Sequence, residues 1–410
     1  MVWNLLHWLR PISGLPNFSH NADDCAMDVF PLPLARIGII GGGQLGRMMA
    51  KAAKRLGCTC VVLDPTPGSP ASQVAGHQII GDYHDPAKLR ELAELCDVTT
   101  FDIEDIDTET LLQLEREGHR FHPSPKVLAL IQDKLTQKQA LADAGISTAP
   151  FVAMPEPSPE AFAEFGYPLV QKARRGGYDG RGVSIMKSAE DYRAHLPVPS
   201  LLERFVPAAK ELAVVVARGL DGECRCYPVV EMCFRPGENV LEMLLAPADV
   251  SQATADAAIE LAVRTVEMLD GVGIFGVEMF LTESGELLVN EVAPRTHNSG
   301  HHTIEANVTD QFEQHLRAVV GLPLGITDQL SPAAMINLLG APGHRGRPTI
   351  KGLNEALAIP GVCLHLYGKA ATSPYRKMGH VTVLDPDIES AKRKAKRVRD
   401  LIEISGEDHP

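Results

Sequence analysis

The segment from Val277 to His302 reads VEMFLTESGELLVNEVAPRTHNSGHH, and it decides how the middle of this chain folds. Two apolar runs, 278–282 and 287–291, are typical of strands, and a short turn containing Gly285 separates them. If Ser284 and Gly285 form a two-residue hairpin loop, the register makes residues 278 and 291, both glutamates, direct cross-strand neighbours.

Two carboxylates that face each other on paired strands repel, so this arrangement destabilises a sheet unless a cation lies between them. Mg²⁺ is commonly held by one or two carboxylates, with waters and phosphate oxygens completing its shell. We expect Phe280, Leu287 and Val289 on the face of the glutamates, which indicates that this face is covered. The sequence therefore predicts Glu278 and Glu291 as ligands of Mg²⁺, which Mn²⁺ can replace; the alternative is a hairpin with solvent-facing glutamates.

Composition narrows the class of protein. The chain has 410 residues, 45% of them hydrophobic, which is enough for two to three domains with large cores. A net charge of −13 argues against a nucleic-acid partner, and no apolar run approaches the roughly 18 to 20 residues that span a bilayer. The eight cysteines include no C-x-x-C pair, so we expect free thiols in a reducing cytosol and a cytoplasmic protein.

Residues 1–34 differ from the rest of the chain. They contain both tryptophans and precede the first clear strand, and no basic residues stand ahead of the apolar stretch as a signal peptide requires. We expect a disordered extension, or an over-long start assignment with Met27 as the initiator.

Apolar patterning predicts alternating strands and helices from residue 36 onward, which is typical of a parallel sheet with flanking helices. The expected elements of this first region are strands 36–40, 59–63 and 98–101 and helices 45–56, 86–96 and 126–144. Further on, we expect strands 169–173, 183–186, 201–205, 211–218, 225–232, 275–282, 335–339, 362–366 and 379–383, with helices 253–269 and 388–402. The basic side chains of the last helix are interpreted as a solvated face.

Two glycine-rich loops compete as the nucleotide site. Residues 41–46, GGGQLG, fit G-x-G-x-x-G between a strand and a helix, with Asp64 ending the next strand; alone, this pattern favours an NAD-binding oxidoreductase, although such a turn binds any phosphate. Residues 174–182, RRGGYDGRG, form a cationic loop suited to closing over triphosphate oxygens. The second loop lacks the P-loop signature, and its alternative is a flexible surface hairpin.

The motifs occur in a specific order: Asp133-Lys134-Leu-Thr-Gln-Lys138, Lys172 with GGYDGRG, Glu203 with Glu211, and NEVAPRTHNSGHH. In this order they resemble the ATP-grasp superfamily and, within it, the N5-carboxyaminoimidazole ribonucleotide synthetase family of purine biosynthesis, over about residues 36–385. The resemblance implies a homodimer with a three-domain ATP-grasp fold, combining α/β and α+β parts and starting with a Rossmann-like parallel sheet. The implied domains are 35–133, 134–325 with a lid over about 145–207, and a β-rich domain, 326–410.

The resemblance also implies roles for individual residues. Contacts to ATP are implied for Lys134, Lys172, Gly177, Tyr178, Asp179, Gly180, Arg181, Gly182, Val183, Glu203, Arg204, Phe205, Val206, Glu211, Asn290 and Glu291. Contacts to aminoimidazole ribonucleotide are implied for Tyr178, Arg181, Lys369 and Arg376, and the first glycine loop becomes a substrate-side turn with Gly43 and Gln44. The catalytic set is Arg295, His297, Asn298, Asp179 and Lys369. One departure is Phe234, which stands where some relatives have a histidine near the nucleotide.

The implied reaction begins with phosphorylation of bicarbonate by ATP, which gives carboxyphosphate. The amine of aminoimidazole ribonucleotide is then carboxylated, and either Asp179 or His297 handles its proton. His301 and His302 are interpreted as helix-entry residues near the site. The alternatives are an ATP-grasp ligase that uses formate or an amino acid, the oxidoreductase suggested by the first glycine loop, and a non-catalytic nucleotide sensor.

Overall fold

The computed structural model describes residues 32–177, 182–234 and 241–407. The chain divides into two compact units, residues 1–122 and 123–410, and each is described by itself. Most of the predicted 1–34 extension, including Met27, lies outside the described residues. The boundaries of the three expected domains stay a prediction.

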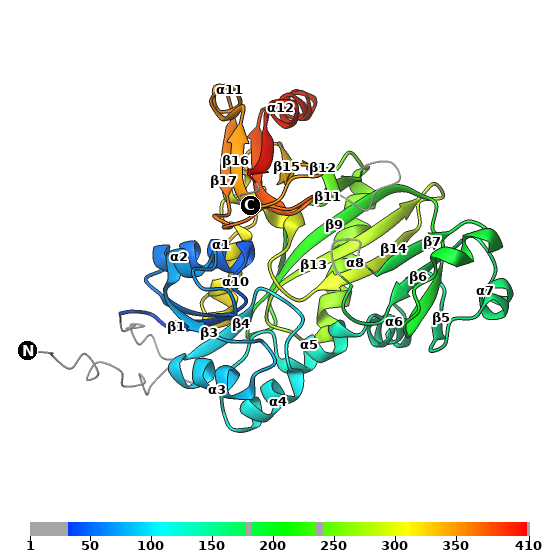
Figure 1. Cartoon of the computed structure of the whole chain (residues 1–410), viewed down its shortest axis with the longest axis horizontal. Coiled ribbons are helices and arrows are strands. Elements are labelled where there is room, and N and C mark those ends of the chain that lie inside the picture. Colours follow the sequence, from blue (N-terminus) through cyan, green and yellow to red (C-terminus); the bar gives the residue numbers. More distant parts are fainter. Residues whose placement is uncertain (1–31, 178–181, 235–240, 408–410) are drawn as a thin grey trace, which may run out of the picture. The chain divides into compact units, whose positions relative to one another are not determined.

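The first unit is built around a four-stranded parallel sheet in the order β3-β2-β1-β4 (Figure 1). This order is the start of a doubly wound sheet and confirms the Rossmann-like prediction. The third strand, β3, was not predicted, because its residues are mostly exposed and form little apolar pattern. The elements are β1 (Arg36–Ile40), α1 (Gln44–Arg55), β2 (Thr59–Asp64), α2 (Ser72–Ala75), β3 (Gly76–Ile80), α3 (Pro86–Leu95), β4 (Val98–Phe101) and α4 (Thr108–Arg116).

The second unit contains a nine-stranded sheet, whose first strands lie side by side in Figure 1. Its order is β14 (Leu287–Ala293), β13 (Gly273–Thr282), β9 (Ala208–Arg218), β11 (Val230–Phe234), β12 (Leu241–Ala246), β15 (Ala333–Leu339), β18 (Lys377–Leu384) and β17 (Val362–Leu366), with β10 (Cys224–Cys226) paired to β9. The strands expected in a β-rich C-terminal domain therefore continue the same sheet.

A smaller antiparallel sheet and several helices complete this unit. The small sheet has the order β5 (Phe151–Met154), β8 (Ser200–Arg204), β6 (Leu169–Ala173), β7 (Val183–Met186), with α7 (Pro159–Phe165) and the 3₁₀ helix η2 (Ala189–Ala194). The other elements are α5 (Pro125–Gln132), α6 (Lys134–Asp143), α8 (Gln252–Leu269), η3 (Asn298–Gly300), α9 (Thr303–Ala306), α10 (Gln311–Val320), β16 (Arg347–Lys351), α11 (Leu353–Leu357), α12 (Ile388–Leu401) and β19 (Glu403–Glu407).

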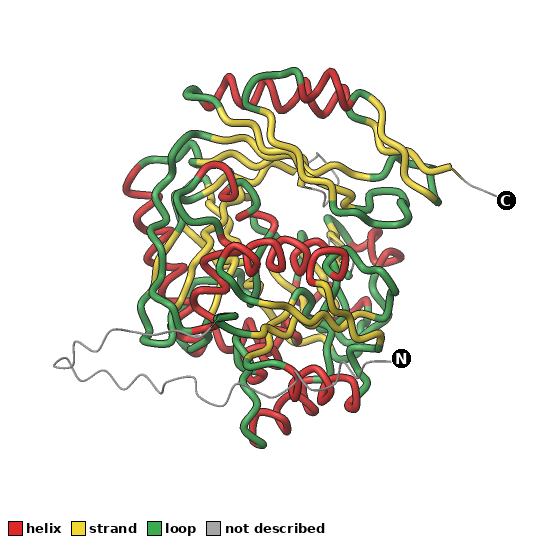
Figure 2. Tube along the Cα trace, turned by 90° about the vertical axis from the view of Figure 1, so that its left-hand side faces the viewer, coloured by secondary structure: helices red, strands yellow, loops and turns green. Residues whose placement is uncertain are grey.

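Two helices cover the large sheet with apolar stripes of helical spacing. Ala258, Leu261, Ala262 and Val266 of α8 are buried against the inner side chains of β9, β13 and β14. Further along the sheet, α12 lies across the C-terminal strands and buries its own alanine and valine stripe there (Figure 2). Each fully buried leucine or valine contributes about 1.5–3 kcal/mol to folding.

The β13–β14 hairpin pairs Glu278 with Glu291, as predicted, but its geometry differs from the expected one. The loop has three residues, because Thr282 N–H donates to Glu286 C=O and Glu286 N–H donates to Thr282 Oγ1, and Gly285 has φ +85°. This longer loop shifts the register by one residue, and a β-bulge at Asn290 shifts it back. The prediction of a two-residue loop was therefore wrong, and the bulge restores the predicted pairing.

The bulge also changes which residues share a face. Residues 287, 289 and 291 would lie on one face of a regular strand. Instead, Leu287 and Val289 pack into the core under α8, while the bulge turns Glu291 to the opposite face, beside Glu278. The expectation that Leu287 and Val289 cover the glutamates was wrong; Phe280, two residues after Glu278, does share their face.

Two other predicted elements are interrupted. The single helix expected over 126–144 is two helices, because Asp133 has the extended backbone of an N-cap and starts α6. The single strand expected over 225–232 is split into β10 and β11 around Pro228, which has no N–H to donate to a sheet.

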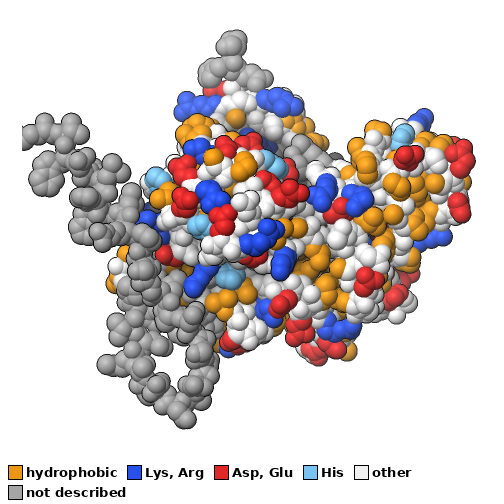
Figure 3. All heavy atoms as spheres, turned by 90° about the horizontal axis from the view of Figure 1, so that it is seen from below, with side chains coloured by type: hydrophobic (Ala, Val, Ile, Leu, Met, Phe, Trp, Pro, Cys, Tyr) orange, Lys and Arg blue, Asp and Glu red, His pale blue; other side chains and the backbone are white. Residues whose placement is uncertain are grey.

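Surface and cysteine chemistry fit an ordinary globular chain. Side chains of both charge signs are mixed over the face drawn in Figure 3, so the net charge of −13 is not gathered into one acidic field there. The seven cysteines in the described part of the chain are free thiols, as predicted, and Cys25 lies outside it. None of the helices in the described ranges is long and apolar enough to cross a bilayer.

The N-cap of α6 generates a stability prediction. Asp133 is 4% exposed, accepts from the backbone N–H groups of Leu135 and Thr136, and accepts three bonds of 2.7–3.1 Å from the Arg174 guanidinium. Asp133→Ala should lower the free energy of unfolding by about 1–3 kcal/mol, since both the cap and the ion pair are lost. Asp133→Asn keeps the cap and should lose less. Equal losses of unfolding free energy in the two variants, measured by thermal unfolding, would show that the cap does not contribute separately from the ion pair.

Candidate functional site

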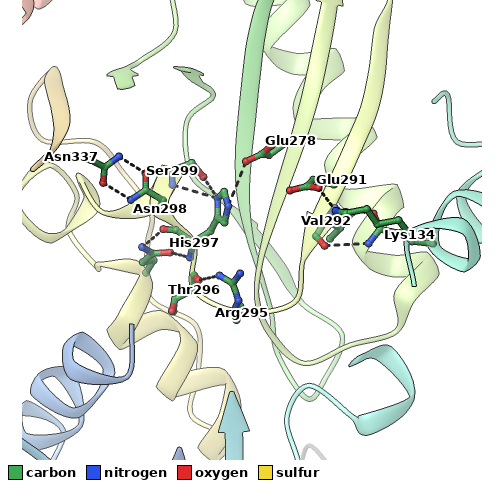
Figure 4. Close-up of polar contacts among 12 residues, drawn as sticks. Lys134, Glu278, Glu291, Val292, Arg295, Thr296, His297, Asn298, Ser299 and Asn337 are labelled. Atoms are coloured by element: carbon green, nitrogen blue, oxygen red, sulfur yellow. Dashed lines mark hydrogen bonds and ion pairs between the residues drawn. The ribbon is translucent and has the colours of Figure 1, made fainter. Parts of the chain in front are cut away.

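Each of the paired glutamates has its own neighbour, and the two neighbours lie on opposite sides of the pair (Figure 4). Lys134, the first residue of α6, places its Nζ 2.6 Å from Glu291 Oε2. On the other side, His297 Nε2 lies 3.5 Å from Glu278 Oε1. The two carboxylates are thus held by a cation from one element and an imidazole from another.

Their surroundings give the two carboxyl groups different acidities. Burial, together with the negative charges of Glu291 and Glu211, raises the pKa of Glu278 to about 8. The ammonium of Lys134 outweighs burial at Glu291 and holds the pKa of that carboxyl well below its usual range. Of the two carboxyl groups, Glu291 therefore holds its negative charge more strongly, and Glu278 keeps its proton to higher pH.

A third carboxylate lies on the neighbouring strand β9. Glu211 is opposite Phe280, and Ala213 is opposite Glu278, so the two glutamates share one face of the sheet at diagonal positions. Burial raises the pKa of Glu211 to about 7, and the charge of Lys172 opposes this shift. Three carboxylates therefore gather on the face that the bulge created.

Two further lysines, Lys172 of β6 and Lys138 of α6, belong to this cluster of charges. Lys172 Nζ of β6 donates to Asn290 Oδ1 (2.8 Å), the side chain of the bulged residue. It also lies 2.9 Å from Glu203 Oε2 of β8, whose other oxygen is 3.3 Å from Lys138 Nζ of α6. Glu203 and both lysines are buried. Lys138 is part of a motif quoted in the sequence analysis, but no role was predicted for it.

The turn after β14 holds the predicted catalytic residues Arg295, His297 and Asn298. His297 Nδ1 lies 2.9 Å from Ser299 Oγ and 3.4 Å from Ser299 N, which directs Nε2 of the ring toward Glu278. Gly276 leaves room for this ring, because a Cβ there would lie 2.6 Å from His297 Cγ. The guanidinium of Arg295 donates to the carbonyl of Thr296 (3.2 Å).

Two residues that the sequence did not single out fix the shape of this turn. Gln311 is fully buried on α10, accepts from His297 N–H (2.9 Å) and donates to its C=O (2.7 Å), as a paired strand would. Asn298 and Asn337 of β15 exchange two amide hydrogen bonds of 2.9 and 3.0 Å (Figure 4). The spacing in the sequence gave no signal for either contact, since both partners are distant along the chain.

The structure also adds Lys377, the first residue of β18. Its positive charge opposes the upward shift in the pKa of Glu278, and it adds to burial in lowering the pKa of His301. His301 and His302 are both buried just before α9, and burial lowers the pKa of His302 to about 4. Both imidazoles are therefore neutral at pH 7. Their position directly before α9 agrees with the interpretation as helix-entry residues.

Lys369 and Arg376, predicted to bind a substrate phosphate, lie in the loop before β18. Lys369 Nζ is 5.8 Å from the centroid of the Tyr367 ring, and the exposed Arg376 guanidinium donates to Ala371 C=O (2.8 Å). Arg376 directly precedes Lys377, the residue whose positive charge acts on Glu278.

The predicted loop over the phosphates is only partly described. Tyr178, Asp179, Gly180 and Arg181 lie outside the described residues. The residues that flank them, Gly177 and Gly182, approach closely: a Cβ on Gly182 would lie 3.1 Å from Gly177 Cα, and Gly182 has φ +76°. Val183 then starts β7, opposite Lys172 in the register.

The predicted adenine strand continues from Glu203 through Arg204, Phe205 and Val206. The Arg204 guanidinium lies 4.9 Å over the Phe165 ring, so this side chain points to α7 and away from Glu203. Phe205 is 38% exposed, and Val206 C=O accepts from Ala208 N–H. Phe234, the departure from the family pattern, packs against an apolar cluster at the end of β11.

In the first unit, the glycine loop that suggested NAD is built differently from a ribose site. Asp64 Oδ2 accepts from Gly42 N–H (2.7 Å) and from Tyr83 Oη–H (2.7 Å), while Oδ1 accepts from Thr66 N–H (2.8 Å). The hydrogen bonds to this buried carboxylate therefore hold the loop in its conformation. In a dinucleotide site the same carboxylate would instead accept a hydrogen bond from a ribose hydroxyl. Gly43 caps α1, and Gln44 is its first residue.

Comparison with known proteins agrees with this architecture. Three family models match successive parts of the chain: a ribonucleotide synthetase preATP-grasp domain over residues 34–132, an ATP-grasp domain over 139–312, and a phosphoribosylaminoimidazole carboxylase C-terminal domain over 333–394. The sheets and the matched domains define an ATP-grasp protein.

Individual relatives narrow the family. The N5-carboxyaminoimidazole ribonucleotide synthetase from Thermotoga maritima is 50% identical, with a TM-score of 0.85, over 91% of this chain and all of that one. The N5-carboxyaminoimidazole synthase from Aspergillus clavatus, solved with ADP and 5-aminoimidazole ribonucleotide, is 35% identical, with a TM-score of 0.82, over 89% of this chain and 98% of that one. The chain belongs to the N5-carboxyaminoimidazole ribonucleotide synthetase family.

Some relatives are longer. The chloroplastic phosphoribosylaminoimidazole carboxylase of Vigna aconitifolia is 41% identical over 363 residues, which are 86% of this chain and 65% of that protein. The present chain thus spans about two thirds of the length of this plant relative.

The close packing of His297 on Gly276 can be tested with a double-mutant cycle. Gly276→Ala should lower the melting temperature, because the new methyl group overlaps the imidazole ring. In a His297→Ala background the same change should cost much less, since the ring is gone. Equal losses in both backgrounds would show that the ring does not occupy this space.

The raised pKa of Glu278 predicts how stability depends on pH without metal or nucleotide. An unfolded glutamate titrates near pH ~4.3, so between that pH and about 8 only the folded state keeps the proton, and folding weakens as the pH rises. Glutamine does not titrate. Glu278→Gln should therefore gain stability relative to wild type, by about 1 kcal/mol or more, between pH 5 and pH 9. A pH-independent difference in denaturant unfolding would contradict the assignment.

Proposed function

We propose that this chain uses ATP to carboxylate 5-aminoimidazole ribonucleotide with bicarbonate, giving N5-carboxyaminoimidazole ribonucleotide, ADP and phosphate in purine biosynthesis. The observation that carries the proposal is the pairing of Glu278 and Glu291 between the phosphate-side lysines and the turn of Arg295 and His297. This order along the face suits transfer of a phosphoryl group from a nucleotide to a small anion.

The donor set fits Mg²⁺, with Mn²⁺ as a substitute. Two carboxylates face each other, and the charge of Glu291 adds to burial in raising the pKa of Glu278, so a cation bound between them would be stabilised. Mg²⁺ is commonly bound through one or two carboxylates, with phosphate oxygens and waters as its other ligands. When bound, the ion neutralises charge that develops on the β- and γ-phosphate oxygens.

The side chains of this chain divide the remaining work. Lys172 and Lys134 present ammonium groups for the nucleotide phosphates, and Glu211 is placed to accept from ribose hydroxyls. Arg295 offers a planar guanidinium, which suits bicarbonate and carboxyphosphate. His297, whose Nε2 faces Glu278, stands between the metal ligands and Arg295 and is suited to exchanging a proton there.

The remaining predicted contacts stay part of the proposal. Water must be kept from carboxyphosphate, a role that suits the loop between Gly177 and Gly182. Tyr178, Arg181, Lys369, Arg376, Gly43 and Gln44 are proposed to contact aminoimidazole ribonucleotide, and Asp179 or His297 to take its amine proton. We further propose a cytoplasmic homodimer with no nucleic-acid or membrane partner.

The oxidoreductase alternative loses its main support, because Asp64 already accepts three hydrogen bonds from its own unit. An ATP-grasp ligase with another acyl donor, and a nucleotide sensor without turnover, are distinguished by assay.

Phosphate release provides that assay. Purified protein should release phosphate from ATP only when both bicarbonate and aminoimidazole ribonucleotide are present. Glu278→Gln and Glu291→Gln should each lower kcat by at least about 100-fold, because a magnesium ligand is lost at the transition state. Turnover with formate and none with bicarbonate would overturn the proposal, and absence of turnover in the wild type would favour the sensor.

A further inference from the structure

Lys138 is a buried cation whose ammonium is surrounded by protein groups. It is 2% exposed, and its Nζ donates hydrogen bonds to Thr148 Oγ1 (2.5 Å) and Val289 O (3.4 Å). It also forms an ion pair with Glu203 Oε1 at 3.3 Å. The charge of Lys138 is therefore directed at Glu203 inside the protein.

The acceptors of Lys138 belong to parts of the second unit that are already tied together. Thr148 Oγ1 donates to Val289 O (2.7 Å), and Val289 N–H donates to Ser147 O (2.8 Å). Val289 directly precedes the bulged residue Asn290 of β14, and Glu203 lies on β8. Lys138 thus joins α6, the small sheet and the bulge at one point.

Glu203 is shared between two lysines in a way that leaves a surplus of charge. Its Oε1 faces Lys138, and its Oε2 faces Lys172 at 2.9 Å. One carboxylate and two ammonium groups give a net charge of about +1 in this cluster. Lys172 makes one further bond, to Asn290 Oδ1 (2.8 Å), which leaves one of its hydrogens for a ligand.

A buried ammonium is costly, and an apolar residue of similar length would often stabilise the fold as well or better. Burial lowers the pKa of Lys138 to about 8, although Glu203 opposes this shift. The lysine is therefore poorly explained as packing alone. Unlike a methionine at this position, the lysine supplies one positive charge that faces Glu203.

We propose that Lys138 is a positioning residue for nucleotide binding: it neutralises Glu203 so that the charge of Lys172 stays directed at the phosphates. The inference rests on the proposed function in that Lys172 is taken as the phosphate contact. It goes beyond that function because Lys138 itself touches no ligand and acts through the shared carboxylate.

Binding of Mg-ADP, measured by isothermal titration calorimetry, tests this role without the other substrates. Lys138→Met leaves Glu203 to neutralise Lys172, so the affinity for ADP should fall by at least about tenfold. Lys138→Arg keeps the charge and should retain most of the affinity. In the phosphate-release assay, Lys138→Met should raise KM for ATP more than it lowers kcat, because the charge acts on the bound nucleotide.

A second variant separates charge from folding. Lys138→Arg is that variant, because it keeps the positive charge against Glu203 while the packing of the side chain changes, and Glu203 itself stays in place. Lys394→Met, which breaks an ion pair of 2.6 Å with Asp385 beside α12, is the matched control and should bind ADP as wild type does. Melting temperatures of all variants establish that each is folded at the assay temperature.

The possible outcomes are distinct. Wild-type affinity in Lys138→Met, or an equal loss of affinity in folded Lys138→Arg, would overturn the role of Lys138 while leaving the proposed function intact. A wild-type chain that binds no ADP at millimolar concentration would overturn the proposed function and, with it, the nucleotide role of Lys138.

Discussion

The β-bulge at Asn290 determines which side of the large sheet carries charge. In a regular strand, Glu291 would follow Leu287 and Val289 into the core beneath α8, where an ionised carboxylate is strongly unfavourable. One extra residue turns the glutamate to the other face and places it opposite Glu278. The extra residue itself, Asn290, contacts Lys172, so the irregularity contributes a side chain as well as a change of face.

The charged groups of this face are arranged so that carboxylates lie beside cations. Lys134 faces Glu291, Lys138 and Lys172 face Glu203, and the proton of Glu278 stays on because burial and a neighbouring carboxylate favour the neutral form. These contacts come from α6, β6, β8 and the hairpin, which are separated by up to 157 residues along the chain. Because each cation serves a particular carboxylate, the site is a network in which one substitution changes the charge seen by its neighbours.

The turn after β14 is held by neutral groups instead. Gln311 substitutes for a strand partner along the backbone of His297, and the paired amides of Asn298 and Asn337 tie the turn to β15. Gly276 provides the space in which the imidazole lies against the sheet. The turn that we propose as the anion site is therefore held by hydrogen bonds between neutral groups, and the guanidinium of Arg295 and the nearby Lys377 contribute positive charge.

The sequence by itself determined the class of the fold, the parallel sheet of the first unit and the pairing of two glutamates, because apolar periodicity, glycine turns and motif order depend on neighbouring residues. It gave the wrong loop length at Gly285 and the wrong neighbours for the glutamates, since a bulge adds no distinctive residue to the pattern and its effect appears only in the register. Asp133 looked like the middle of a helix, although its cap and its bonds to Arg174 make it a boundary. Only the tertiary structure decided that Asp64 braces its own loop, that Gln311, Asn337 and Lys377 belong to the site, and that Lys138 shares Glu203 with Lys172. Those facts rest on contacts between distant segments, and long-range packing is the information that local patterns do not contain.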